Sequence, residues 1–170
     1  MLGPDGSERP RGEVGEIYMR STNRQSPSYR YVGAEAKATD DGWESLGDMG
    51  SMDDDGYVYL ADRRTDMILS GGANVYPAEV ESAIDEHPSV RSCAVIGLPD
   101  EDLGGRIHAI VQLADEATLT EDELRSHLAE RLVRYKVPRS FEFVDEPLRD
   151  DAGKVRRSAL REARVTGAVS

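Results

Sequence analysis

The sequence predicts an α+β protein in which helices and a β-hairpin flank a central β-sheet, and a β-rich segment precedes this compact domain. Two apolar runs rich in β-branched residues, "VRSCAVIGLP" and "GRIHAIVQLA", are the strongest strand candidates. Two segments with helical periodicity, "PAEVESAIDEH" and "TEDELRSHLAERLVRY", lie on either side of these runs. Turn signals are frequent before residue 62, which is typical of short strands joined by turns.

The β-rich segment, residues 1–62, contains two predicted strands. "GEVGEIYMRS" places one at Glu16–Arg20, with Ile17 and Met19 on one face. "GYVYLAD" places the other around Tyr57–Leu60. The preceding "DDDG" is a hairpin turn, because Asp-Gly tolerates the positive φ that such turns need. Turn signals are frequent from Gly42 to Leu60, in "DDGW", "LGDMG" and "DDDGY".

The compact domain is predicted over residues 66–165. "DMILSGGANVYP" is a predicted hairpin, and Pro77 suits the first position of the helix that follows it. Thr120 can cap the next helix together with Glu123. The buried stripe of that helix is expected to consist of Leu124, Leu128 and Leu132. "RSFEFVDE" is a predicted strand, "SALREARV" a terminal helix, and residues 166–170 a disordered tail.

Composition excludes several classes of function. Acidic residues outnumber basic ones 33 to 21, and the net charge of −12 disfavours nucleic acid as a partner. The one cysteine, Cys93, excludes an internal disulfide, and the three histidines lack metal-ligand spacing, so no metal site is expected. No apolar run reaches membrane length and the N-terminus is not signal-like. We therefore expect a cytoplasmic protein without a transmembrane segment.

Lys154 is the first candidate for chemistry. It follows Gly153 in a polar loop that joins the last predicted strand to the terminal helix. A surface lysine is the simpler explanation, but an ammonium group on a glycine-containing loop also suits stabilising negative charge on phosphate or carboxylate oxygens. The loop is not a Walker loop, because no glycine lies five residues before Gly153 and Val155 follows the lysine. Spacing alone leaves both explanations open.

Other candidates lie in turns and at the joint between the two parts. Gly71 and Gly72 are explained by a good hairpin turn, or by a narrow ligand that passes over bare backbone. Asp48, in "GWESLGDMG", is explained by turn chemistry or as a bidentate acceptor for two neighbouring sugar hydroxyls. Arg63 is either a solvated boundary residue or a second contact to the same sugar. Glu79 and Glu81 are most simply first-turn acids of a helix.

Four stretches in one order resemble the C-terminal portion of AMP-forming acyl-CoA synthetases, in the superfamily that also holds luciferases and nonribosomal peptide adenylation domains. They cover most of residues 12–165 and read "DGWESLGDMGSMDDDGYVYLADR", "DRRTDMILSGGANVYPAEVE", "SVRSCAVIGLPDEDLGGRIHAIVQL" and "PLRDDAGKVRRSAL". The resemblance implies that residues 1–62 are the β-rich C-terminal end of a large N-terminal adenylate-forming domain. It also implies a hinge at residues 63–65 and a mobile small C-terminal domain at residues 66–165.

The resemblance implies a two-step acid–thiol ligase that uses a small-molecule carboxylic acid, ATP and CoA. The carboxylate attacks the α-phosphate of ATP, the small domain rotates, and the thiol of CoA attacks the acyl-adenylate. By position, Asp48 and Arg63 match the residues that hold the ribose hydroxyls of ATP or AMP. Lys154 matches the catalytic lysine that bridges carboxylate and phosphate oxygens during adenylation. Gly71 and Gly72 match the hairpin that lines the pantetheine tunnel of the CoA site.

The sequence departs from the family's pattern at several positions. Thr65 falls at the hinge position, where Asp or Lys is usual, and Leu69 sits where some members carry a lysine. Asp62 replaces the usual glycine before the arginine. Ser45-Leu46 replaces the Arg-Thr often seen before Gly-Asp. In the stretch that contains them, Asp48 is therefore the residue that still matches the family's ligand for the ribose hydroxyls.

No Ser/Thr/Gly-rich phosphate loop occurs in the 170 residues. The resemblance places that loop, the adenine-stacking segment, the acyl pocket and the glutamate that binds Mg²⁺ in the missing large domain, in cis and upstream of residue 1. We therefore expect a fragment or truncated ligase that is inactive alone, with Mg²⁺ as a cofactor bound outside this chain.

Two alternative functions stay open. The first is an adenylation domain that loads a carrier protein, although the absence of a carrier-domain sequence after residue 170 favours free CoA. The second is a non-catalytic module that binds nucleotide or CoA. Its phosphate contacts would come from the basic cluster of Lys154, Arg156, Arg157, Arg161 and Arg164.

The sequence gives one indication of the acid substrate. The stretch "YRYVGAEAKATDDGWESLGDMG" is similar to ligases of larger hydrophobic acids, including steroid or bile acid side chains. The sequence does not specify an oligomeric state, and a homodimer stays open.

Overall fold

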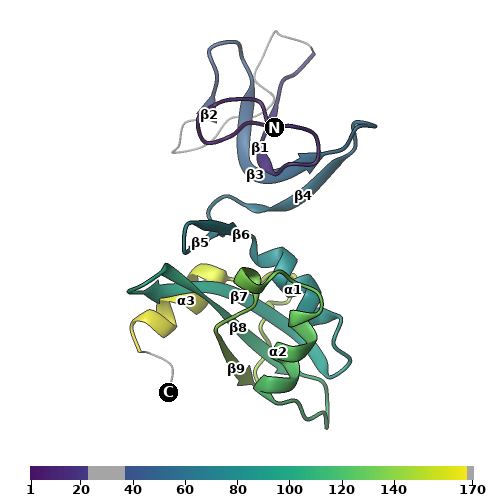
Figure 1. Cartoon of the computed structure of the whole chain (residues 1–170), viewed down its shortest axis with the longest axis vertical. Coiled ribbons are helices and arrows are strands. Elements are labelled where there is room, and N and C mark those ends of the chain that lie inside the picture. The colour runs from purple at the N-terminus through teal and green to yellow at the C-terminus, as the bar shows by residue number, and fades with distance from the viewer. Residues whose placement is uncertain (23–36, 168–170) are drawn as a thin grey trace. The chain divides into compact units, whose positions relative to one another are not determined.

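The structure, a computed structural model, describes residues 1–22 and 37–167 (Figure 1). The chain divides into two compact units, Met1–Thr65 and Asp66–Ser170. The beginning of the stretch compared with ligases of larger acids, and the last three residues of the predicted tail, lie outside the described residues.

The first unit is built on one antiparallel sheet (Figure 1). Its strands are β1 (Gly15–Met19), β2 (Lys37–Ala38), β3 (Glu44–Met52) and β4 (Val58–Arg63). Strand β3 is central and pairs with each of the other three. The two strands predicted in this segment correspond to β1 and β4.

Strand β3 is a strand that the turn signals between residue 42 and the second strand did not predict. This glycine-rich stretch forms one strand of nine residues, in which Gly47 interrupts the extended backbone with a φ of +81°. Gly50 passes so close to β4 that a Cβ atom there would lie 2.4 Å from the carbonyl oxygen of Tyr59. The pairing of β3 with β4 also shifts register between Met49 and Gly50. Close backbone approach and an irregular ladder both explain glycine within a strand.

The second unit contains the predicted α+β domain (Figure 1). Its elements are β5 (Ile68–Ser70), β6 (Ala73–Val75), α1 (Pro77–Asp85), β7 (Val90–Asp100), β8 (Gly104–Leu113), α2 (Glu121–Ala129), a 3₁₀ turn (Arg134–Lys136), β9 (Ser140–Val144) and α3 (Arg157–Val165). Strands β5 and β6 form the predicted hairpin. The central sheet has the order β7-β8-β9, with β8 antiparallel to β7 and parallel to β9. The fold class is therefore as predicted.

Helix α2 is shorter than the periodicity predicted. Its capping box is present, because Thr120 Oγ1 accepts the N–H of Glu123 and the Glu123 carboxylate accepts the N–H of Thr120. The helix ends at Ala129, so Leu132 lies beyond it and is only half-buried. The chain turns there, buries Pro138 and enters β9 beside β8. Strand pairing thus overrides local helical propensity.

The core lies on both faces of the central sheet, because side chains alternate along its strands. One face of β7 and β8 packs with the buried residues of α1 and α2, among them Val80, Ile84 and Leu128. The opposite face carries a smaller cluster, into which Leu160 of α3 packs. Helix α3 has no buried residue of its own. Apolar contact therefore fixes α1 and α2 firmly, and α3 weakly.

Replacing Leu128 by alanine should destabilise the second unit by about 3 kcal/mol, because a fully buried leucine leaves a cavity in the α1–α2 core. Urea unfolding followed by far-UV circular dichroism measures this, since the helices of the described residues all lie in the second unit. Val133→Ala, at a position 55% exposed, is the matched control and should cost less than about 0.5 kcal/mol. Equal losses in the two variants would contradict the assigned core.

Acidification should destabilise the second unit through His108 and Glu142. Burial lowers the pKa of His108, so the neutral ring favours the fold and that contribution is lost as the pH falls below the usual histidine range. Hydrogen bonds from Arg164 lower the pKa of Glu142, so its contribution is lost at still lower pH. Urea unfolding between pH 7 and pH 4 should show a steady loss. His108→Gln should flatten the upper part of this profile, and an unchanged profile would contradict the assignment.

Candidate functional site

The Gly-Lys loop connects β9 to α3 and is shaped by its own backbone. Arg149 and Val155 form an isolated antiparallel bridge across its base. Asp150 Oδ1 accepts two backbone N–H groups, including that of Lys154 at 2.9 Å, which lowers the pKa of the Asp150 carboxyl. Gly153 has a φ of +73°, where a side chain would be strained. These bonds present residue 154 in a defined turn.

Lys154 differs from the other basic residues near the C-terminus. It is exposed, and no acceptor within residues 1–22 and 37–167 pairs with its ammonium group. Arg157 instead forms a bidentate (two-pronged) ion pair with Glu81, in which two of its N–H groups donate to the two carboxylate oxygens. Arg164 forms a pair of the same kind with Glu142. The predicted basic cluster is therefore not a patch of free cations. Lys154 remains the charge best able to meet a ligand.

The hairpin of β5 and β6 turns at Gly71 and Gly72, whose φ angles are +57° and +81°. The N–H of Gly71 donates to the carbonyl of Leu103 at 3.0 Å, which ties the tip to the loop between β7 and β8. A Cβ atom on Gly71 would lie 3.2 Å from Leu103, whereas one on Gly72 would meet nothing within 4 Å. Positive φ thus explains both glycines, and Gly72 also faces open space.

A cavity of about 1100 Å³ lies beside this hairpin within the second unit. Its lining combines small residues of the hairpin with basic and aromatic residues that follow α2. They include Ser70, Gly71, Arg134, Tyr135 and Arg139. A site of this size and mixed polarity suits part of a small-molecule ligand.

Asp48 and Arg63 are brought together in the first unit. They are cross-strand partners in β3 and β4, and Arg63 Nε lies 3.9 Å from Asp48 Oδ1. Asp48 lies within a strand, which corrects the expectation that a turn holds it. Arg63 is exposed and Asp48 is half-buried, and their atoms are 3.9 Å apart, so the ionic attraction between the two side chains is weak and both can turn to a ligand.

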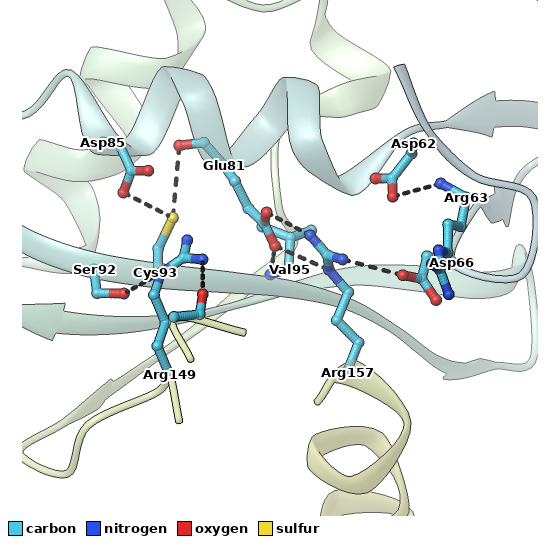
Figure 2. A network of polar contacts seen from close by, with 11 residues as sticks. Asp62, Arg63, Asp66, Glu81, Asp85, Ser92, Cys93, Val95, Arg149 and Arg157 are labelled. Carbon is cyan, nitrogen blue, oxygen red and sulfur yellow. Dashed lines mark hydrogen bonds and ion pairs between the residues drawn. The ribbon is translucent and has the colours of Figure 1, made fainter. Parts of the chain in front are cut away.

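Figure 2 shows a polar network that sequence reasoning missed. Arg157 Nε and Nη2 donate to the two oxygens of Glu81 at 3.1 and 2.6 Å, and its Nη1 donates to Asp66 at 3.0 Å. Glu81 is buried and also accepts the N–H of Val95 at 2.8 Å. It is therefore not a solvated first-turn acid. The one clue in the sequence was an acidic residue on the apolar face of the α1 helix. Its arginine partner lies at the start of α3, so the spacing of residues within α1 could not reveal the pair.

The described residues contain no group of three His, Cys, Asp or Glu side chains that could hold a metal ion. In the same part of the chain, no helix combines the length and apolarity required to cross a membrane.

Comparison with known proteins defines the class of this domain. Residues 79–154 match the family model described as the AMP-binding enzyme C-terminal domain. The matched region runs from α1 through the central sheet to Lys154. Residues 79–154 therefore belong to the family of AMP-binding enzyme C-terminal domains.

The chain is similar to several CoA ligases and also to a fatty acid–[acyl-carrier-protein] ligase from Streptomyces coeruleorubidus, to which it is 38% identical over 158 residues. It is 42% identical over 161 residues to a feruloyl-CoA synthase from Amycolatopsis sp, covering 95% of this chain and 33% of that protein. It is 45% identical over 152 residues to the 3-[(3aS,4S,7aS)-7a-methyl-1,5-dioxo-octahydro-1H-inden-4-yl]propanoyl:CoA ligase of Rhodococcus jostii, covering 89% of this chain and 30% of that protein. The chain thus spans about one third of the length of these relatives and is similar to their C-terminal portion.

A solved structure agrees with this assignment. The o-succinylbenzoate CoA synthetase of Bacillus subtilis, in complex with the acyl-adenylate intermediate, superposes with a TM-score of 0.78 at 35% identity. The similarity covers 96% of this chain and 34% of that one. It extends over both units, so the β-rich segment has a counterpart in an adenylate-forming enzyme as well.

Proposed function

We propose that this chain is the C-terminal part of an ATP-dependent, AMP-forming acyl-CoA ligase. The observation that carries the proposal is the free ammonium group of Lys154, held on an ordered turn at the end of an AMP-binding enzyme C-terminal domain. In this proposal, residues 1–62 end the large domain, residues 63–65 form the hinge with Thr65 as its pivot, and residues 66–165 rotate. The chain alone does not form adenylate.

Lys154 stabilises the adenylation step by its charge. A carboxylate oxygen of the acid attacks the α-phosphorus, the bond to the pyrophosphate oxygen breaks, and negative charge accumulates on the oxygens between the two reactants. A compact ammonium group without a competing carboxylate can contact oxygens of both partners at once. A guanidinium group is planar and larger, and would fit this position less well. In this proposal the glutamate that binds Mg²⁺ belongs to the upstream large domain, and the described residues contain no group of three His, Cys, Asp or Glu side chains for it.

The other candidate residues take supporting roles. The Asp48 carboxylate accepts the two ribose hydroxyls of ATP or AMP, while Arg63 opposite it donates to the same sugar. Gly71 and Gly72 let the pantetheine arm of CoA pass over bare backbone after rotation. The thiol then attacks the acyl carbonyl, and AMP leaves. We place the enzyme in the cytoplasm, where CoA and ATP are available.

The first test is the size of the native protein. Immunoblotting source cells with antibody against this chain should reveal a band much larger than 18.7 kDa. Purified intact protein should then exchange labelled pyrophosphate into ATP in the presence of its acid. A native band at 18.7 kDa would contradict a ligase role for this chain.

The acid is sought among larger hydrophobic carboxylates, including aromatic and polycyclic acids. Two relatives, a feruloyl-CoA synthase and a ligase of a bicyclic propanoyl group, support this choice. The second half-reaction is measured with free CoA and with a phosphopantetheinylated carrier protein. Transfer to CoA supports the proposal, and transfer only to the carrier would replace it by carrier loading.

A further inference from the structure

The part of the Gly-Lys loop between Arg149 and Val155, called the Lys154 turn below, is ordered by its own hydrogen bonds but makes few contacts to the rest of the domain. The backbone hydrogen bonds that Asp150 accepts, and the backbone bridge of the loop, join loop residues to one another. Arg149 reaches out to Ser92 of β7, but at 3.3 Å and in an exposed position (Figure 2). Leu148 packs against the smaller apolar cluster of the sheet and holds the chain where it enters the loop. On the other side of Lys154, the position of the turn depends on helix α3.

Helix α3 is itself held mainly by polar contacts. None of its residues is buried, and it contributes Leu160 to the smaller apolar cluster. Arg157, at its first position, bonds Glu81 and Asp66; Arg164, at its far end, bonds Glu142. Arg157 lies three residues after Lys154, so it is the anchor nearest to the proposed catalytic group.

The contacts of Arg157 join three separate parts of the second unit (Figure 2). Glu81 is fixed in α1 and, through its bond to the N–H of Val95, in the central strand β7. Asp66 is the first residue after Thr65. A two-pronged arginine–carboxylate pair that is largely removed from solvent fixes both distance and orientation. Arg157 therefore connects the start of α3 to the sheet and to the first residue of the rotating unit.

We propose that Arg157 is a positioning residue that sets Lys154 for adenylation, with Glu81 and Asp66 as its supports. This rests on the proposed ligase function of Lys154. Because both carboxylates already bind it, Arg157 does not itself contact substrate. When the unit turns at the hinge, Asp66, α3 and the Lys154 turn move as one body. A displacement of the lysine by about 1 Å can lower the rate of a positioned reaction by up to about 100-fold.

The first test needs no catalysis and uses the 170-residue chain. In Arg157→Gln, hydrogen exchange should become at least about tenfold faster in residues 150–160, and stay unchanged in α1 and β7. Arg164→Gln is the matched control, since it removes the other two-pronged pair of the same helix. It should accelerate exchange at the far end of α3 without affecting the Lys154 turn. Unchanged exchange at residues 150–160 in Arg157→Gln would overturn the proposal.

The second test measures both half-reactions of the intact enzyme. Arg157→Gln should lower kcat of pyrophosphate exchange about tenfold, leave KM for ATP within about twofold, and leave CoA transfer from supplied acyl-adenylate within about threefold. Arg157→Lys should restore part of the loss, because the charge remains while the two-pronged geometry is lost. Equal losses in Arg157→Gln and Arg164→Gln would show that α3 merely needs anchoring, and would overturn the proposal. A wild-type enzyme that shows no pyrophosphate exchange would refute the ligase function. The hydrogen-exchange experiment would still test the positioning role of Arg157 independently.

Discussion

Lys154→Ala in the intact ligase is expected to lower adenylate formation about 100- to 1000-fold. The ammonium group has no competing partner within the described residues and is presented by a turn that its removal leaves intact, since the turn is held by backbone and by Asp150. Loss of one group that stabilises developing charge typically costs this much. Pyrophosphate exchange under saturating ATP measures the effect. CoA transfer from supplied acyl-adenylate should stay within about threefold of the wild type, because the lysine acts before the thiol arrives.

Two control variants separate charge from folding. Lys154→Arg keeps a positive charge but replaces the compact ammonium group, so it should recover little of the lost exchange activity. Arg156→Ala removes a neighbouring exposed cation whose contact to Asp150 is 3.4 Å long, and should change exchange less than about threefold. If Lys154→Ala lowers both half-reactions equally, the role assigned to this lysine is wrong.

Local signals along the chain predicted most elements correctly. The Asp-Gly turn before β4, the Gly-Gly bend between β5 and β6, and the capping box of α2 each depend on bonds among residues close in sequence. Such bonds are visible in a sequence because they need particular residues at fixed spacing. The family resemblance then favoured a catalytic role for Lys154 over that of an ordinary surface lysine.

The errors share a physical cause, which is contact between distant segments. Strand β3 was hidden because Gly47 and Gly50 are typical of turns, yet Gly50 is required by the approach of the β4 backbone. Helix α2 ends at Ala129 although the local helical pattern continues, and the chain then turns and pairs with β8 as strand β9. The partnership of Arg157 with Glu81 spans 76 residues, and Glu81 alone looked like an ordinary helix acid. Tertiary contacts of this kind leave no periodic trace in either segment.

Gly72→Leu is expected to block the second half-reaction while sparing the first. A Cβ atom at residue 72 would meet nothing within 4 Å, so a leucine side chain would start in open space and project into the space proposed for the pantetheine arm. CoA transfer from supplied acyl-adenylate should fall by about 100-fold, the scale expected from misplacing a reacting group by about 1 Å. Pyrophosphate exchange should stay within about threefold, because the hairpin is assigned no part in adenylation.

The control must reproduce the backbone strain of this substitution without the obstruction. Gly56 has a similar positive φ, +88° against +81°, and also meets nothing within 4 Å, but it lies in the turn between β3 and β4 of the first unit. Each leucine variant should lose about 1–2 kcal/mol of stability, because both force a side chain into the left-handed region. If Gly56→Leu slows CoA transfer as much as Gly72→Leu does, strain explains the loss. If only Gly72→Leu does so, the hairpin lines the path of the thiol, because the two variants then differ in position alone.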